Sequence, residues 1–574
     1  MKTILRYLKP FYIRMLAGFT IKVTGTLAEL MLPYILSHIL KNVVAAQSVR
    51  LIVIWGGIMV LCAVSAMLCN IIANRMAARV SSNFSEKMRH DLFRKTLRLS
   101  AAQTDRFTVA SLESRITTDT YNVHNFVGMM QRMGVRAPIL LIGGVIITLV
   151  MDSYLATAML VLLPFIFLTV YFISRKGVPL YTKVQKSVDS MIRVVREDVQ
   201  GIRVIKALSK SDYEHRRYDV VNKELVKDEK HAGTVMSAVN PIMTLLMNIG
   251  LVAVVTLSAS RVADHSSDPE TVIAFMQYFT MISMAMMSVT RIFTMYTKCS
   301  ASARRITEIL ESEDELKERS CEKFPSIDTD AHIVFDNVSF SYDGKKNDID
   351  NISFNLKKGE SLGIIGATGS GKSTIIKLLL RFYDVDSGAI YINGQDIRTI
   401  DRGRLYSYFG TCLQNDFLYA DTVAENIRFG RDIQMDKITA AAKTAQADGF
   451  INEFPEKYDH MLSPKGTNIS GGQKQRLLIA RAVADSPDIL IFDDSSSALD
   501  YRTEADLRRA LAAEFADTTV ITVAQRVSSV KSCDLILVID DGKIVGSGTH
   551  DELLRTCDEY NEISNSQIGG AFVE

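Results

Sequence analysis

Residues 361–379 read SLGIIGATGSGKSTIIKLL, and this stretch decides the fold of the C-terminal half of the chain. The apolar run 361–365 has the composition of a buried strand, and the run that begins at Thr374 has the spacing of a helix. Between them, GATGSGKS matches the pattern GxxxxGK[ST] of a phosphate-binding loop. Glycines let such a loop curl so that its N–H groups point at phosphate oxygens, and the helix N-terminus that follows favours negative charge. The strand, loop and helix together predict a nucleotide site.

The motif assigns roles to individual side chains. Lys372 is expected to reach the β- and γ-phosphates, and the hydroxyl of Ser373 is expected to bind Mg²⁺. Asp493 ends the apolar run ILIF at 489–492, so its carboxylate is the expected second anchor for Mg²⁺. The residues predicted to hold the nucleotide in this loop are Gly366, Ala367, Thr368, Gly369, Ser370, Gly371, Lys372, Ser373 and Thr374.

A second anion-binding helix start lies downstream of the loop. Ser470, Gly471, Gly472 and Gln473 precede the helical run KQRLLIARAV. One bound nucleotide does not need two such helix starts from a single chain. This segment is therefore predicted to close over a nucleotide that another subunit holds.

The pattern of elements changes along the chain. After about residue 330, short β-rich runs alternate with helical stretches, which predicts an α/β domain with a mainly parallel sheet over residues 331–574. Residues 300–330 contain the charged stretch ESEDELKERSCEK and are predicted to form a linker.

Long apolar segments dominate residues 1–299. Each has about 20 residues, which is enough for a helix that rises ~1.5 Å per residue to cross a ~30 Å hydrocarbon core. The six predicted spans are 16–38, 51–73, 133–151, 154–173, 236–258 and 271–293. We therefore expect a multi-domain chain in which an all-α transmembrane domain of six helices precedes an α/β P-loop nucleotide-binding domain.

Charge is distributed unevenly between the two halves. Residues 1–300 hold 35 Lys and Arg against 19 Asp and Glu, whereas the remaining residues hold 31 against 45. The long loops 74–125 and 174–235 are basic, and the loops on the opposite side are short. The positive-inside rule places both termini and the nucleotide-binding domain in the cytoplasm of a multi-pass plasma-membrane protein. The seven cysteines include no CxxC pair and fit a reducing compartment, and nothing in the charge pattern indicates a nucleic-acid partner.

Two features inside the spans are candidates for function. Lys22 and Glu29 lie seven residues apart in the first span, where they either pair with polar groups on neighbouring helices or face a substrate cavity. The sixth span carries five methionines that either line an adaptable apolar pocket or, as we favour, pack in the core: Met276, Met281, Met284, Met286 and Met287.

Together these motifs resemble one half of an ABC transporter, an exporter-type six-helix membrane domain fused to a nucleotide-binding domain, over essentially the whole chain. The resemblance implies that Tyr342 in VSFSY stacks on adenine and that Gln414 in CLQND lies beside Mg²⁺. It also implies that Asp500 in SSALD belongs to a loop that crosses to the partner. Two segments resemble the coupling segments of the family, 112–115 with Asp119, and 201–206.

Two residues depart from the family pattern. Asp494 stands where a catalytic Glu is usual, and Gln525 stands where a switch His is usual. Asp is one methylene shorter than Glu, and a misplacement near 1 Å can lower a rate by ~10²-fold. Gln can hydrogen-bond a γ-phosphate, but it cannot carry charge or accept a proton as His does. The two changes are either tolerated in a slow but competent site or, as we favour because both face the same γ-phosphate, mark a weakened site.

The resemblance and these departures imply one half of a heterodimeric ATP-driven exporter that uses ATP and Mg²⁺. Its own site would hydrolyse ATP poorly, and its signature segment would complete the partner's active site. The expected surroundings are a lipid bilayer and a second ABC half-transporter, with a homodimer as the lesser possibility. The expected cargo is an amphipathic or hydrophobic small molecule or peptide. The alternatives are an importer of metal chelates with the exporter fold, and a sensor or structural subunit that uses ATP as a clamp.

Overall fold

The chain forms two compact units in a computed structural model that describes residues 1–263, 269–313, 316, 318–319, 324–414, 416–495 and 498–569. The first unit comprises Met1–Arg98 and Phe107–Ser312, and the second comprises Leu99–Arg106 and Glu313–Glu574. Of the predicted segments, part of the loop 259–270 and part of the linker 300–330 lie outside the described residues.

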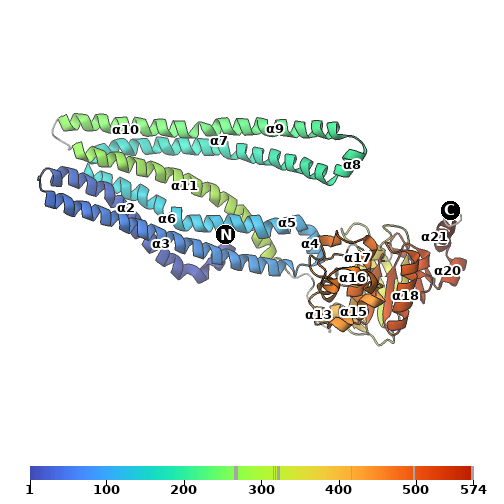
Figure 1. Cartoon of the computed structure of the whole chain (residues 1–574). Coiled ribbons are helices and arrows are strands. Elements are labelled where there is room, and N and C mark those ends of the chain that lie inside the picture. Colours follow the sequence, from blue (N-terminus) through green and yellow to red (C-terminus); the bar gives the residue numbers. More distant parts are fainter. Residues whose placement is uncertain are drawn as a thin grey trace. The chain divides into compact units, whose positions relative to one another are not determined.

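The first unit is built from long helices that lie side by side (Figure 1). The long helices are α2 (Tyr12–His38), α3 (Val49–Thr96), α6 (Thr120–Met151), α7 (Ser153–Gln200), α9 (Ser211–Ser237), α10 (Val239–Ala263) and α11 (Pro269–Leu310). The shorter elements are α1 (Lys2–Leu8), α5 (Val109–Ser114), α8 (Ile202–Ala207), a 3₁₀ turn (Lys9–Phe11) and two π-helical segments (Ile39–Val44 and Arg115–Asp119).

Within the described residues, four helical stretches are long and apolar enough to cross a membrane: Lys2–Val44, Val49–Thr96, Val109–Met151 and Glu270–Leu310. Helices α7 and α10 carry shorter apolar stretches, Ser153–Thr169 and Thr244–Ala259. Five of the six predicted spans fall inside single helices. The span predicted at 236–258 instead begins in α9, because the chain turns at Ala238 and Pro241 occupies the first turn of α10, where its missing N–H is tolerated.

Small residues let these helices approach closely. A Cβ added to Gly25 of α2 would lie 2.7 Å from Cys69 of α3, and one added to Gly144 of α6 would lie 2.8 Å from Ile282 of α11. Tyr278 of α11 is fully buried, and its hydroxyl donates a hydrogen bond of 2.6 Å to the carbonyl oxygen of Leu30. Packing of small and aromatic side chains therefore joins α2, α3, α6 and α11.

The second unit contains two sheets, which confirms the predicted α/β fold of the C-terminal half. A six-stranded sheet has the order β10-β9-β3-β8-β7-β6, in which β10 alone is antiparallel to its neighbour. Its strands are β3 (Ser361–Ile365), β6 (Phe409–Cys412), β7 (Ile489–Asp493), β8 (Thr519–Val523), β9 (Leu535–Asp540) and β10 (Lys543–Gly548). An antiparallel sheet has the order β2-β1-β4-β5, with β1 (Ile333–Phe340), β2 (Ile349–Leu356), β4 (Ser387–Ile392) and β5 (Gln395–Asp396).

Helices cover these sheets, and fully buried aliphatic side chains of β3 and β7 form the centre of the core. The helices of this unit are α12 (Lys372–Leu379), α13 (Arg402–Ser407), α14 (Val423–Arg428), α15 (Met435–Thr444), α16 (Asp448–Glu453), α17 (Gly471–Val483), α18 (Tyr501–Glu514), α19 (Val527–Val530), α20 (His550–Thr556) and α21 (Asp558–Gly569). Because the strands are nearly continuous apolar runs, the parallel sheet is buried on both faces.

One segment from the first half of the chain belongs to the second unit. Residues Leu99–Arg106 contain most of α4 (Ala101–Phe107). Asp105 Oδ2 accepts a hydrogen bond of 2.6 Å from the hydroxyl of Tyr383. Gln103 Nε2 donates one of 2.6 Å to the carbonyl oxygen of Glu313. These contacts fix α4 to the α/β domain.

The coupling segment expected at 112–115 with Asp119 therefore needs a correction, because the segment held in the second unit is 99–106. Asp119 is fully buried in the first unit and forms an ion pair with Arg305 of α11. Arg115 pairs with Glu308 of the same helix at 3.0 Å. The charged residues that resembled a coupling motif thus join helices within the first unit, where residues 201–206 also lie. Helix α11 continues to Leu310, so the first part of the predicted linker is helical.

Candidate nucleotide-binding site

The predicted phosphate loop connects β3 to α12 and requires glycine at both ends. Gly371, which precedes α12, has a φ of +101°, and a Cβ there would lie 2.9 Å from the carbonyl oxygen of Asp348. A Cβ added to Gly366 would lie 2.0 Å from the carbonyl oxygen of Ile539. No larger side chain fits at either position while the loop keeps this path.

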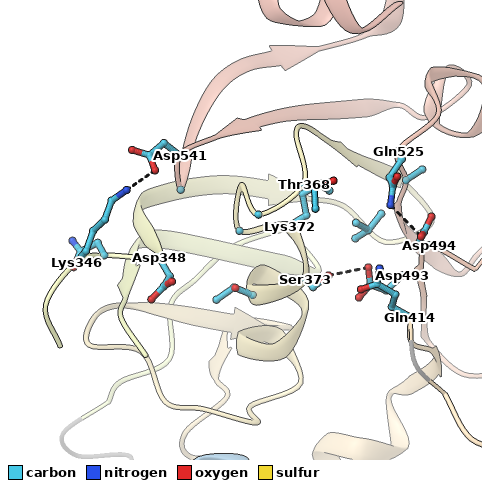
Figure 2. A pocket seen from close by; sticks show the side chains of 17 residues that line it. Lys346, Asp348, Thr368, Lys372, Ser373, Gln414, Asp493, Asp494, Gln525 and Asp541 are labelled. Atoms are coloured by element: carbon cyan, nitrogen blue, oxygen red, sulfur yellow. Dashed lines mark hydrogen bonds and ion pairs between the residues drawn. The ribbon is translucent and has the colours of Figure 1, made fainter. Parts of the chain in front are cut away.

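A cavity of about 270 Å³ lies against the loop (Figure 2). It brings together residues that are far apart in the sequence. The predicted site residues that line it are Thr368, Gly369, Gly371, Lys372, Ser373, Thr374, Gln414, Asp493, Asp494 and Gln525. Gly366, Ala367 and Ser370 support the loop and are not among its lining residues.

Lys372 is bonded to the loop that carries it. Its Nζ donates hydrogen bonds of 2.9 Å and 2.7 Å to the carbonyl oxygens of Gly366 and Ala367. Burial lowers the pKa of the Lys372 ammonium, while the carboxylates of Asp493 and Asp494 act in the opposite direction. The cation is therefore held at the phosphate loop by hydrogen bonds and by two nearby acids.

The residues predicted to bind Mg²⁺ meet at one end of the cavity. Ser373 Oγ donates a hydrogen bond of 3.2 Å to Asp493 Oδ1, and Gln414 lines the same cavity (Figure 2). Burial raises the pKa of Asp493, and the hydrogen bond from Ser373 opposes that shift. A hydroxyl, a carboxylate and an amide oxygen are ligands that Mg²⁺ prefers, so these residues fit the ion.

The two departures from the family pattern are in direct contact. Gln525 Nε2 donates a hydrogen bond of 3.2 Å to Asp494 Oδ2 (Figure 2). Asp494 follows β7 with a φ of +50°, a left-handed conformation that Asp tolerates better than most residues. Burial raises the pKa of Asp494, and the cations of Lys372 and Arg526 oppose that rise. At this cavity Gln525 and Asp494 thus stand where the family usually has His and Glu.

Tyr342 lies beside the cavity and is not part of its lining. Its hydroxyl lies 3.4 Å from Thr374 Oγ1, and its ring packs edge-on against Tyr383 at 5.1 Å. Lys377 lies 5.4 Å from the centre of the ring. The side chain is 44% exposed, which leaves ring surface on which an adenine could stack.

The signature segment and Asp500 lie outside this cavity. Ser470 begins α17 with a capping box, in which its side chain accepts from the N–H of Gln473 and the Gln473 side chain accepts from the N–H of Ser470. Asp500 begins α18 and accepts from the N–H of Thr503 at 2.9 Å. Of the signature residues, Ser470 and Gly471 are exposed and Gly472 and Gln473 are half-buried. Among the described residues, none of the signature segment lines the cavity at the phosphate loop.

A glutamine of α17 connects the signature helix to the site. Gln475 Nε2 donates a hydrogen bond of 3.3 Å to the carbonyl oxygen of Asp494, and its Oε1 accepts one of 2.9 Å from the N–H of Ala498. One side chain therefore links α17, the end of β7 and the loop that precedes Asp500.

The sequence did not identify the residues on the far side of the cavity. Most come from the turns after β1 and β9, where Lys346 pairs with Asp541 at 2.7 Å (Figure 2), and two come from the end of β8. The lining residues that were missed are Lys346, Asn347, Asp348, Val523, Ala524, Asp541 and Gly542. The turn 343–348 directly follows Tyr342, which was the one local signal, whereas no local pattern marks Asp541.

Comparisons with known proteins agree over almost the whole chain. Residues 15–286 match the family model of the ABC transporter transmembrane region, and residues 349–497 match the ABC transporter model. The chain is 34% identical to the ABC transporter ATP-binding protein YfiB of Bacillus subtilis over 571 residues, which cover 99% of each protein. It is 32% identical to the ABC transporter ATP-binding protein Rv1273c of Mycobacterium tuberculosis, over 99% of this chain and 98% of that protein.

A solved structure shares the fold. It is described as a bacterial Atm1-family ABC exporter with ATP bound, and it matches 99% of both chains with a TM-score of 0.81 and 23% identity. At this identity the match supports the arrangement of helices and sheets only.

Proposed function

The chain belongs to the ABC transporter family, as a transmembrane region fused to an ABC ATPase domain, and we propose that it is the slowly hydrolysing half of a heterodimeric exporter. The family fixes the coarser function, which is an ATP-binding subunit of a membrane transporter with the exporter fold. The hydrogen bond between Gln525 and Asp494 carries the finer proposal, because it places both altered residues at one point of the nucleotide cavity.

The residues of the cavity would hold ATP in a defined way. Lys372 and the N–H groups of the phosphate loop bind the phosphates, and Tyr342 offers its ring to the adenine. Ser373, Gln414 and Asp493 would hold Mg²⁺, which neutralises charge on the β- and γ-phosphates when it is bound. Binding therefore relies on residues that follow the family pattern.

Hydrolysis relies on the two residues that do not follow it. A general base must accept a proton from the attacking water within hydrogen-bond reach. Asp494 is shorter than Glu, and its Oδ2 already accepts a hydrogen bond from the neutral amide of Gln525. Gln525 can orient a phosphate oxygen but cannot carry a charge. We expect hydrolysis at this site to be slower by ~10² than at a site with Glu and His.

The signature segment supports the second half of the proposal. Ser470 and Gly471 are exposed at the N-terminus of α17, where a helix favours an anion, and the segment is not part of the lining of its own chain's cavity. It would therefore close the site of a second, non-identical half-transporter that keeps Glu and His. Asp500 would lie in the loop between the two sites.

Transport would run outward across the plasma membrane, with both termini and the ATPase domain in the cytoplasm. ATP would draw two ATPase domains together and turn the cavity between the membrane domains outward. The cargo class that we propose is amphipathic or hydrophobic small molecules or peptides. Accumulation assays in inverted and right-side-out vesicles separate export from import of a metal chelate.

The test restores the two altered residues. In the purified chain, which contains an intact signature segment, Asp494→Glu combined with Gln525→His should raise ATP hydrolysis by about tenfold to 10²-fold relative to the unmodified chain. The control adds Lys372→Ala to the double variant and should abolish the gain. An unmodified chain that already hydrolyses ATP as fast as the double variant, and that loses nothing in Asp494→Asn, would contradict the proposal.

A further inference from the structure

A cavity of about 380 Å³ in the first unit is lined by charged side chains on helices that can cross a membrane. Helices α2, α3 and α6 form it, and its polar lining consists of Lys22, Glu29, Asn70, Asn74 and Arg136. Its apolar lining consists of Leu32, Ala63, Ala66 and Met67. Ionisable groups inside membrane-spanning helices generally mark a substrate path.

Lys22 has no acid for a partner. The residue is 4% exposed, and its Nζ donates hydrogen bonds of 2.6 Å to Asn70 Oδ1 and 3.2 Å to Asn74 Oδ1. Amide oxygens satisfy hydrogen-bond donors but do not neutralise a charge. Among the described residues, the hydrogen-bond partners of the ammonium are thus neutral amides, and its nearest charged neighbours are Glu29, Arg136 and Arg132.

The single carboxylate of the cavity is already paired. Both oxygens of Glu29 accept hydrogen bonds from the guanidinium of Arg136, one of them from Nε at 3.2 Å. Such a bidentate pair is among the strongest that two side chains make. Because the charges of Glu29 and Arg136 cancel, the ammonium of Lys22 gives the lining of the cavity a net charge of one positive unit.

The position of Lys22 along its helix sets its depth. Lys22 precedes Val44 by 22 residues, and Asn70 follows Val49 by 21 residues. At ~1.5 Å per residue, both lie more than ~30 Å from the turn that joins these helices, which is the thickness of a hydrocarbon core. Glu29 lies about 10 Å nearer that turn along α2. With the proposed orientation, Lys22, Asn70 and Asn74 lie at the cytoplasmic edge of the membrane, and Glu29 and the apolar lining of the cavity lie within it.

We propose that this cavity binds the phosphate or carboxylate group of an amphipathic cargo molecule, which enters from the cytoplasmic side of the membrane. This inference rests on the proposed export function and names its substrate class. The anionic group would contact Lys22 and the exposed edge of Arg136, whose side chain is 46% exposed. The apolar chain would lie along Leu32 and Met67, the latter 53% exposed at the cavity. The charge of the buried Lys22 is in this way matched by an opposite charge on the cargo.

The experiment measures binding by the full-length chain without ATP. Three probes share a twelve-carbon tail and differ in their head group: dodecyl phosphate, dodecylphosphocholine and dodecyltrimethylammonium. Native mass spectrometry of the chain, released from phosphatidylcholine nanodiscs, reports the fraction that carries one probe. We expect dodecyl phosphate to bind at least tenfold more tightly than the cationic probe. Inorganic phosphate should not displace it at equal concentration, and displacement would show a site for free anions and overturn the proposal.

Two variants are expected to act in opposite directions. Lys22→Met removes the charge that has no acid as a hydrogen-bond partner and should weaken the binding of dodecyl phosphate at least tenfold. Glu29→Gln removes the carboxylate that pairs with Arg136 and should strengthen the binding of dodecyl phosphate severalfold. Loss of folding cannot produce tighter binding, so the pair distinguishes a binding role from a structural one. Equal binding of the three probes, or no change in both variants, would overturn the proposal.

The matched control is Lys41→Met, which removes the same charge from the π-helical segment Ile39–Val44 after α2 and should leave binding unchanged. ATP binding measured on the same samples reports whether the second unit is intact. Failure of the heterodimer proposal would appear in the hydrolysis assays and would leave these binding data unaffected.

Discussion

At the scale of single residues, Lys372 serves both the fold and the ligand. Its ammonium group holds two carbonyl oxygens of its own loop and lines the nucleotide cavity. The two nearby acids favour its charged form against burial. Removing it therefore takes away the cation that faces the phosphates and leaves two loop carbonyls without their donor.

We expect Lys372→Ala to weaken ATP binding by about tenfold to 10²-fold, since a hydrogen bond to a charged group contributes ~1.5–3 kcal/mol. Equilibrium binding of a fluorescent ATP analogue to the full chain measures the change. Lys443→Ala, on an exposed position of α15, removes the same charge and should have no effect. Unchanged affinity in Lys372→Ala would remove this loop from the proposed site.

At the scale of elements, a short helix from the first half of the chain is held beside the aromatic residue predicted to stack on adenine. Asp105 of α4 accepts from Tyr383, and the Tyr383 ring meets the edge of Tyr342. A hydrogen bond and a ring contact thus connect α4 to Tyr342. Helix α4 is thus the element from the first half of the chain to which the surroundings of Tyr342 are directly connected.

We predict that Tyr383→Phe loosens α4 while it leaves the ring contact in place. Loss of a hydrogen bond to a carboxylate should speed amide hydrogen exchange in α4 by about tenfold if the helix opens locally. Mass spectrometry of the exchanged peptides measures this. Tyr458→Phe is the matched control, because the Tyr458 hydroxyl donates to Asp448 at 2.7 Å in another part of the same unit. Equal exchange of α4 in all three proteins would contradict the prediction.

What the sequence revealed depended on how local each signal was. The phosphate loop follows from eight consecutive residues, and the meeting of Asp494 with Gln525 follows from two neighbouring parallel strands, β7 and β8, that end at the same edge. The contact of Asp105 with Tyr383 spans 278 positions of the sequence, and no local pattern signals it. From the sequence we instead expected the coupling segment at 112–115 with Asp119. Charged residues that form ion pairs with α11 cannot be told apart in the sequence from charged residues that contact another domain.

At the scale of the whole molecule, the two units differ in charge and in surroundings. Basic residues concentrate in the first half and acidic residues in the second. Helices α3, α7 and α11 have 48, 48 and 42 residues, about twice what a membrane span needs, and α7 continues to Gln200 beyond its apolar stretch Ser153–Thr169. The basic parts of these helices would extend on the cytoplasmic side, where anionic lipids attract them.

Orientation can be tested with single cysteines. We expect Ala46→Cys, in the turn before α3, to react with a membrane-impermeant maleimide on intact cells. Ser211→Cys, at the start of α9, should react only after the cells are opened. Both positions are exposed, so accessibility of the side chain does not limit either reaction. The reverse pattern would show that the termini face outward.

The contacts of Gln475 have a consequence for timing. Its amide group forms hydrogen bonds with the backbone of Asp494 and of Ala498. One side chain therefore holds both a residue of the nucleotide cavity and the segment that precedes Asp500. A shift of Asp494 on nucleotide binding would be transmitted through Gln475 to the segment that precedes Asp500. With the slow hydrolysis that we propose, Gln475 would in this way couple the state of the nucleotide site to the time for which two half-transporters stay closed.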